Sequence, residues 1–177
     1  MIHIETSRLL MSQIQQHHWP LFLRLHQEEE VIRYAFDQPS EAEIRSRFDS
    51  RLPQWRWGSE HWLCLVIRDS QTEQAIGITG LCISEAETSE IEVGYLLLPE
   101  FHGCGYGTES LLGLKQYVQD HFPVAAITAI VTDGNVASCK VLEKSGFELA
   151  EREKNAYRIG NQVYDDLQYR CQLECAN

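Results

Sequence analysis

Residues 92–110 constrain the fold more than any other part of the chain, because they read as a strand, a glycine-rich turn and a helix in direct succession. An apolar strand runs to Pro99, three glycines follow within residues 103–107, and Thr108 and Glu109 open an apolar-periodic helix. Such a turn presents backbone N–H groups and the positive end of a helix dipole to one point. Glycine also lets a pyrophosphate approach the backbone. The segment therefore predicts a phosphate-binding turn.

Two common phosphate-binding motifs do not fit this turn. A P-loop ends in Gly-Lys-Ser/Thr, and no such ending is present. A dinucleotide-binding turn needs the spacing G-x-G-x-x-G, and Thr108 stands where the third glycine would fall. Glycine-rich turns also join strands to helices without binding any ligand, so the choice depends on the rest of the chain.

Four blocks of the sequence resemble the GNAT acetyltransferases. Residues 102–107 are similar to the R/Q-x-x-G-x-G/A signature that binds the pyrophosphate of acetyl-CoA, with His102 in place of Arg or Gln. Residues 135–147 resemble the N-x-x-S-x-x-V-L-E-K-x-G-F block, in the form typical of the ribosomal-protein N-terminal acetyltransferase (RimJ/RimL-like) branch. Residues 5–11 resemble the T-x-R-L-x-L opening of that branch, and residues 92–95 also match it. The blocks occur in order over nearly the whole chain.

The resemblance implies a mixed α/β (α+β) GNAT fold, with a mostly antiparallel sheet of about six to seven strands and about four helices. In that fold the sheet splays between its strands 4 and 5, because of a bulge. The patterns along the chain agree, and Ser40 with Glu43 predicts a capping box. They predict strands near 2–11, 61–68, 74–84, 89–98, 124–131, 147–158 and 162–172, and helices near 16–31, 40–52, 108–121 and 135–145. No repeat or linker interrupts residues 1–177, which indicates one domain.

The bulk composition excludes some partners. The formal net charge of −11 argues against nucleic acid, which needs a basic surface. This charge would steer a cationic amine, or it keeps the protein soluble. No apolar stretch is long enough to cross a bilayer, and the N-terminus lacks the form of a signal peptide. We therefore expect a cytoplasmic protein without a membrane partner.

The cysteines and histidines show no metal-ligand spacing. The six cysteines form no C-x-x-C pair, so we expect neither a metal nor a disulfide framework. His17, His18 and His26 fall in a polar helical region and are interpreted as surface residues. The tryptophans at positions 55, 57 and 62 read as core residues or as an aromatic wall for the acceptor.

The resemblance implies which residues bind acetyl-CoA. Main-chain groups of the strand that carries residues 92–98 would pair with the pantetheine arm, and backbone N–H groups of the glycine turn would hold the pyrophosphate. Asn135 would bind the pantetheine amides, or it is simply a helix N-cap. The implied set is Tyr95, Leu97, Leu98, His102, Gly103, Cys104, Gly105, Tyr106, Gly107, Thr108, Asn135 and Ser138.

Two residues are the candidates for catalysis. Many GNAT enzymes use a tyrosine seven residues after the equivalent of Asn135 to protonate the leaving thiolate, and Leu142 stands at that position. The RimJ/RimL-like pattern offers Ser138 instead, acting by hydrogen bond or through water. Glu92 is the best candidate for the base that takes the ammonium proton, with Glu90 nearby on the same strand. A structural or exposed glutamate is the alternative for Glu92.

The sequence thus predicts direct acetyl transfer from acetyl-CoA to a primary amine, either a protein N-terminus or a small amine. An antibiotic or polyamine acetyltransferase is a second interpretation. A third is a catalytically silent module that senses acyl-CoA. Either a monomer or a homodimer is compatible with the sequence.

Overall fold

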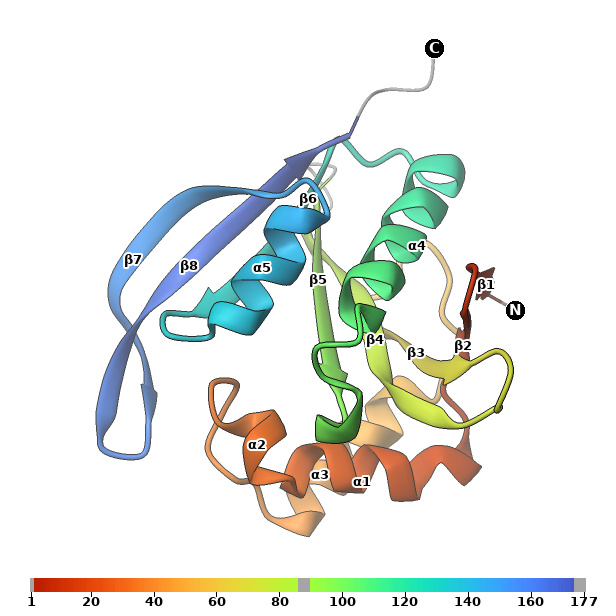
Figure 1. Ribbon diagram of the computed structural model, residues 1–177, viewed down its shortest axis with the longest axis horizontal. Helices are drawn as coiled ribbons and strands as arrows, with labels where there is room; N and C mark the ends of the chain where they lie inside the picture. Colours follow the sequence, from red (N-terminus) through yellow and green to blue (C-terminus); the bar gives the residue numbers. More distant parts are fainter. Residues whose placement is uncertain (1, 86–89, 174–177) are drawn as a thin grey trace.

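Eight strands form one sheet in the part of the chain that the computed structural model describes, residues 2–85 and 90–173 (Figure 1). Their order is β1-β2-β3-β4-β5-β6-β8-β7, and β5 and β6 form the one parallel pair among them. The strands are β1 His3–Glu5, β2 Leu9–Gln13, β3 Leu63–Asp69, β4 Ala75–Glu85, β5 Glu90–Leu97, β6 Ala126–Thr132, β7 Glu148–Ile159 and β8 Gln162–Gln172. The mostly antiparallel α/β sheet of the prediction is confirmed, with one strand more than expected.

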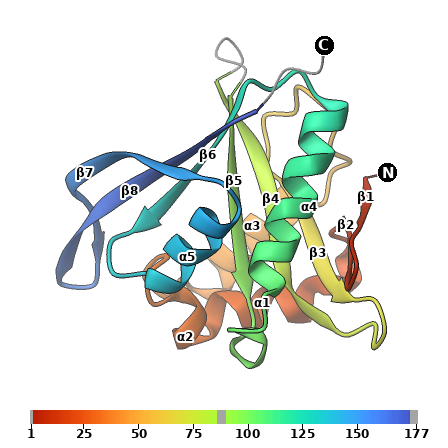
Figure 2. The ribbon, with the colours of Figure 1, turned by 45° about the horizontal axis from the view of Figure 1, so that its top comes forward.

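Within the described ranges, five α-helices cover the two faces of the sheet (Figures 1 and 2). Helices α1 Trp19–Gln27, α2 Glu29–Ile32 and α3 Glu41–Arg51 lie on one side, here called the α1–α3 face. Helices α4 Tyr106–His121 and α5 Val136–Lys144 cover the opposite side, the α4/α5 face. Successive strand residues alternate between the two, so Leu65 packs with the α4/α5 core and Val66 with the α1–α3 core.

The predicted N-terminal strand and first helix are each divided in the structure. Residues 6–8 turn out of the first strand because Thr6 Oγ1 accepts the Leu9 N–H at 3.1 Å and donates to Glu109. The helical region at 16–31 opens as a 3₁₀ turn, Gln16–His18, and continues as α1 from Trp19, with Pro20 in its first turn. Extended backbone at Glu28 then separates α1 from α2. The predicted capping box at Ser40 and Glu43 is confirmed at the start of α3.

The splay between β5 and β6 opens directly after Glu92. The two strands pair only from Glu90 to Glu92, opposite residues 126–128. Beyond that point β5 stays with β4 to Leu97, while β6 stays with β8 to Thr132. The family bulge is not in this part of β5, whose register with β4 is unbroken from Ile91 to Leu97. The register shift lies earlier, between Ile83 and Glu85 of β4.

The long hairpin of β7 and β8, which turns at residues 160–161 as predicted, reaches the loop between α2 and α3 (Figure 1). The Gly160 N–H donates to the Asp37 carboxylate at 2.5 Å, and the rings of Tyr34 and Tyr164 meet edge to face with centroids 6.3 Å apart. These contacts join two segments that are far apart in sequence. None of the helices in the described ranges is both long and apolar enough to span a membrane.

Candidate active site

The glycine turn leads from β5 into α4 as expected. After β5 a 3₁₀ turn spans Pro99–Phe101, and α4 begins at Tyr106, two residues before the predicted start. Gly103 and Gly105 have φ of 74° and 82°, in the left-handed region that favours glycine. A Cβ on Gly107 would lie 3.2 Å from Val141 Cγ2 of α5. The glycines therefore let the turn at the start of α4 pack closely against α5 and Arg8.

A polar contact from the N-terminal block holds this turn, and sequence reasoning missed it. The Glu109 carboxylate accepts hydrogen bonds from Thr6 Oγ1 at 2.7 Å, Ser7 Oγ at 3.0 Å, and the Arg8 N–H and Nε at 2.8 and 2.6 Å. Arg8 Nη1 also donates to the Cys104 carbonyl at 3.1 Å. The signal was present, because Thr6 and Arg8 belong to the T-x-R-L block. Their partner on α4 could not be read from the sequence.

His102 bonds to the end of β5. Its Nε2 lies 2.9 Å from the Leu97 carbonyl, so this nitrogen carries the hydrogen and donates it. Its Nδ1 faces Glu30 at 3.9 Å. The Nε2–H of His102 is therefore used on the Leu97 carbonyl, a main-chain group that the sequence analysis assigned to the pantetheine arm. Cys104 is exposed in the same turn.

Ser138 receives a partner that the sequence did not predict. The Tyr95 hydroxyl lies 2.8 Å from Ser138 Oγ, and burial raises the pKa of this phenol to about 12. Asn135 is the N-cap of α5, because its side-chain oxygen accepts the Ser138 N–H at 3.2 Å. Leu142 is fully buried in the core. Tyr95 thus brings a phenol to Ser138 from β5 rather than from α5.

Glu92 lies on the opposite face of β5 from Tyr95. It is half-buried opposite Cys82 of β4, and burial raises the pKa of its carboxyl. Glu90 differs, because its carboxylate is held by Arg170 at 2.7 Å. The strand therefore presents Glu92 to the α1–α3 face and Tyr95, with Ser138, to the α4/α5 face, at the point where the sheet opens.

The aromatic and histidine predictions are partly corrected. Trp55 is buried, and it and Trp57 pack on Phe122 at the end of α4 with ring centroids 5.6 and 4.8 Å away. Trp62 alone reaches β5, where its ring lies 3.6 Å from the position a Cβ would take on Gly94. His26 is not a surface residue: it is buried, stacks on Phe22 at 4.1 Å and bonds that residue's carbonyl. Its apolar neighbours come from α1 and the α2–α3 loop, which the sequence could not place around it.

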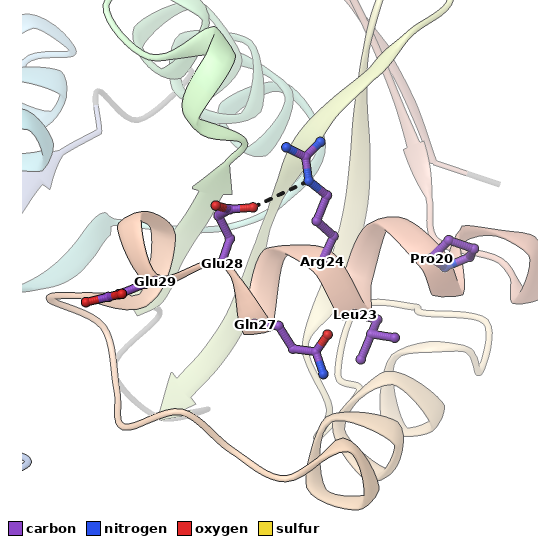
Figure 3. Close-up of a pocket in the computed structure, with 6 residues that line it drawn as sticks. All are labelled: Pro20, Leu23, Arg24, Gln27, Glu28 and Glu29. Carbon is purple, nitrogen blue, oxygen red and sulfur yellow. Dashed lines mark ion pairs between the residues drawn. The ribbon is translucent and has the colours of Figure 1, made fainter.

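Two open hollows mark the surface. The first, of about 380 Å³, lies on the outer side of α1, and Figure 3 shows it lined by Pro20, Leu23, Arg24, Gln27, Glu28 and Glu29. Its cation is already paired, since Arg24 contacts Glu28 at 3.6 Å and Glu100 at 2.8 Å. The second, of about 450 Å³, borders the glycine turn at Gly105 and Thr108 and includes Lys144. Within residues 2–85 and 90–173, no group of three or more His, Cys, Asp or Glu side chains is arranged to hold a metal ion.

A family model described as the acetyltransferase (GNAT) domain matches residues 8–148. The chain therefore belongs to the GNAT acetyltransferase family, whose members are acetyl-CoA-dependent N-acyltransferases.

Individual relatives agree with this family. The chain is 27% identical over 153 residues to YoaA of Bacillus subtilis (strain 168), described as an uncharacterized N-acetyltransferase, covering 82% of each protein. The RimL ribosomal L7/L12 α-N-protein acetyltransferase in complex with coenzyme A has a similar fold, with a TM-score of 0.86 and 18% identity over 99% of this chain and 100% of that one. Spermidine N-acetyltransferase from Vibrio cholerae, in complex with CoA and spermine, also has a similar fold. Its TM-score is 0.81, with 16% identity over 94% of this chain and 96% of that one.

Proposed function

We propose that this protein moves the acetyl group of acetyl-CoA directly to a primary amine, in the manner of the RimJ/RimL-like branch. The observation that carries the proposal is the arrangement along β5. Glu92 stands on one face, the Tyr95–Ser138 pair on the other, and the glycine turn follows at the end of the same strand. This arrangement supports roles for Glu92 as base, for Ser138 with Tyr95 as proton donor, and for the turn as phosphate site, all around one opening in the sheet.

The residues around this opening fit acetyl-CoA. The edge of β5 beyond Glu92 has no strand partner on the β6 side within the described ranges, so its main chain can pair with the pantetheine arm at Tyr95 and at the Leu97 N–H, while His102 occupies the Leu97 carbonyl. Leu98 is buried beneath the start of the turn. The backbone from Gly103 to Thr108 can hold the pyrophosphate through its N–H groups. Gly107 lets this turn pack closely on α5, since a Cβ there would lie 3.2 Å from Val141 Cγ2. The hollow beside the turn, with Lys144, leaves room for the nucleotide end.

Each candidate side chain has a definite part in the transfer. Acetyl-CoA supplies an acetyl group already activated as a thioester. Glu92 takes the proton of the acceptor ammonium, directly or through a water, and its raised pKa makes it a stronger base than an exposed glutamate. Ser138 Oγ donates a hydrogen bond to the leaving sulfur. Tyr95 orients that hydroxyl from 2.8 Å and can resupply its proton.

Two other functions keep some support. The spermidine acetyltransferase shares the fold, so a small polyamine acceptor is a second candidate. A silent acyl-CoA sensor would need the same turn without a working proton donor. The Tyr95–Ser138 contact argues against the sensor, because it replaces the tyrosine that is missing at Leu142.

The test is incubation with acetyl-CoA and a panel of amines, reading the free thiol that is released. We expect amine-dependent thiol release from the natural protein and a loss of most of it in Ser138→Ala, with acetyl-CoA affinity unchanged by calorimetry. Acetyl-CoA binding without thiol release for any amine would establish the sensor instead. Mass spectrometry of the products then shows which amine carries the acetyl group.

A further inference from the structure

A row of residues on the α1–α3 face leads from Glu92 through Gly94 and Trp62 to Arg51 at the end of α3. Gly94 follows Glu92 on this face of β5, and the ring of Trp62 lies against it, 3.6 Å from the position a Cβ would take. The guanidinium of Arg51, in the last turn of α3, lies over that ring with Cζ 5.3 Å from its centroid. The row therefore has a carboxylate at one end and a cation at the other.

Arg51 is half-buried without a carboxylate partner. Among the residues whose side chains the structure describes, 2–83 and 90–173, no carboxylate lies within ion-pair distance of its guanidinium. Burial lowers the pKa of Arg51, and the groups that act on its charge are the thiols of Cys64 and Cys82 and the cation of Arg47. Burial also raises the pKa of these thiols, to about 12 and about 11, so neither is an anion at neutral pH. A half-buried cation without a counter-ion is costly, and beside a substrate opening it marks a place for an anionic ligand group.

The other arginine side chains nearby are engaged or add further positive charge. Arg45 on α3 pairs with Asp49 at 3.0 Å, and Arg170 holds Glu90 at 2.7 Å. Arg47 lies over the Phe36 ring at 5.1 Å and faces the same side as Arg51. A polyamine carries several cations and would need carboxylates along its length, where this face presents Arg47 and Arg51. The local charge thus opposes a polycation, although the whole chain is acidic.

The two ends of the row share one neighbour. The Cys82 thiol lies within electrostatic reach of both Glu92 and Arg51. An acceptor that uses both ends must therefore carry an amine and an anion on one molecule. A small molecule with both groups meets this requirement.

We propose that the acceptor is a small aminocarboxylate, whose amine lies beside Glu92 and whose carboxylate pairs with Arg51 next to the Trp62 ring. This rests on the proposed acetyl transfer and adds the class of acceptor. In the reaction an amide C–N bond forms and the thioester C–S bond breaks. The ammonium gives one proton to Glu92 before attack, and the nitrogen gives its second proton to water as the amide forms. The thiolate takes one proton from Ser138, which regains it from water through Tyr95. The acceptor carboxylate is unchanged and serves only for binding.

The experiment compares α-amino acids with their own amides, alongside spermidine and a short peptide, by thiol release at fixed acetyl-CoA. We expect kcat/KM for the acid to exceed that for the amide by about tenfold, the usual value of a charge-assisted hydrogen bond. Arg51→Met should remove this ratio by raising KM for the acid alone, and Arg51→Lys should keep part of it. Arg56→Met is the matched control, because Arg56 is exposed in the following loop, and it should keep the full ratio.

The outcomes separate this inference from the proposed function. Three results would overturn the acceptor class and leave acetyl transfer standing. They are equal thiol release for acids and amides, a preference for spermidine or the peptide, and an acid-to-amide ratio that survives Arg51→Met. No thiol release with any amine overturns both. Thermal unfolding checks that Arg51→Met is folded. If it is not, the Arg51→Lys and Arg51→Gln variants decide by the same ratio.

Discussion

The two faces of the sheet are built by different means. On the α4/α5 face the donor site is held by short polar contacts between distant segments, such as Arg8 with Glu109 and Tyr95 with Ser138, and by glycines that admit close packing. On the α1–α3 face the side chains near Glu92 are half-buried and incompletely paired, and Arg51 has only an aromatic ring as its partner within the described ranges. In a site for one fixed co-substrate, the polar side chains can be fully paired before the ligand binds. In a site for the acceptor, charged side chains stay available to pair with the ligand.

The largest effect is expected from Glu92→Gln, which removes the base and should lower kcat/KM about 100-fold or more at neutral pH, with acetyl-CoA affinity unchanged. In the natural enzyme, activity should fall as pH drops through the Glu92 pKa, which lies above the ordinary 4.5. A raised pKa in the folded state means that ionised Glu92 opposes folding above that pH. The variant should therefore have an equal or higher Tm.

Glu90→Gln is the neighbouring control for this change. Because Glu90 is held by Arg170, its variant should keep the acid limb of the pH–rate profile. A Glu92→Gln enzyme with a normal rate and pH profile would show that the acceptor face supplies no base.

The next largest effect is expected on the α4/α5 face, at the glycine turn. Gly105→Ala places a Cβ on left-handed backbone, at φ 82° in the N-cap of α4, with the new atom 3.4 Å from Arg8 Nη2. We expect about tenfold weaker acetyl-CoA binding by calorimetry and about 1 kcal/mol less stability. Gly58→Ala is the matched control, because Gly58 has φ 91° and open space around it, away from the turn. It should show the same loss of stability with normal affinity, and equal affinity losses in both variants would contradict the assignment of the turn.

A smaller effect is expected from Tyr95→Phe, which removes the hydroxyl 2.8 Å from Ser138 Oγ. kcat should fall about five- to tenfold with little change in KM for acetyl-CoA, as expected for loss of one hydrogen bond to a reacting group. Because both groups serve one step, the double variant with Ser138→Ala should be no slower than Ser138→Ala alone. If the kcat losses of Tyr95→Phe and Ser138→Ala multiplied in the double variant, Tyr95 would act independently of Ser138.

A further difference between the faces, seen only outside neutral pH, should appear in acid. Burial lowers the pKa of His26 to about 4, from 6.5, so the folded state resists protonation that the unfolded state accepts. Stability should therefore decrease as pH falls from 6.5 towards 4, by up to about 3 kcal/mol from this group. Hydrogen exchange should show α1 and α3 loosening before α4. His26→Phe should weaken the trend without removing it, because burial also lowers the pKa of His18 to about 4, and the exposed control His17→Gln should keep the trend. Uniform loosening of all helices would assign the acid effect to other groups.

Much of the fold could be predicted because local patterns decide it. The capping box at Ser40 and Glu43, the strand–turn–helix around the glycines, and the hairpin turn at residues 160–161 all follow from short-range chemistry. The division of the first strand could not be predicted, because it depends on Thr6 meeting Glu109, 103 residues away. The break at Glu28 likewise has no local signal.

The sequence by itself determined the family and the identity of the donor co-substrate, since the glycine turn and the block at residues 135–147 are contiguous motifs whose chemistry is local. Only the tertiary structure decided which side chains meet across the opening in the sheet. In the structure the Tyr95 hydroxyl contacts Ser138, and the Glu90 carboxylate binds Arg170. Trp55 and Trp57 pack at the end of α4, and the Arg51 guanidinium lies over Trp62. The physical reason is that burial and pairing of a charged or polar group depend on neighbours from other elements, and a linear pattern does not contain those neighbours.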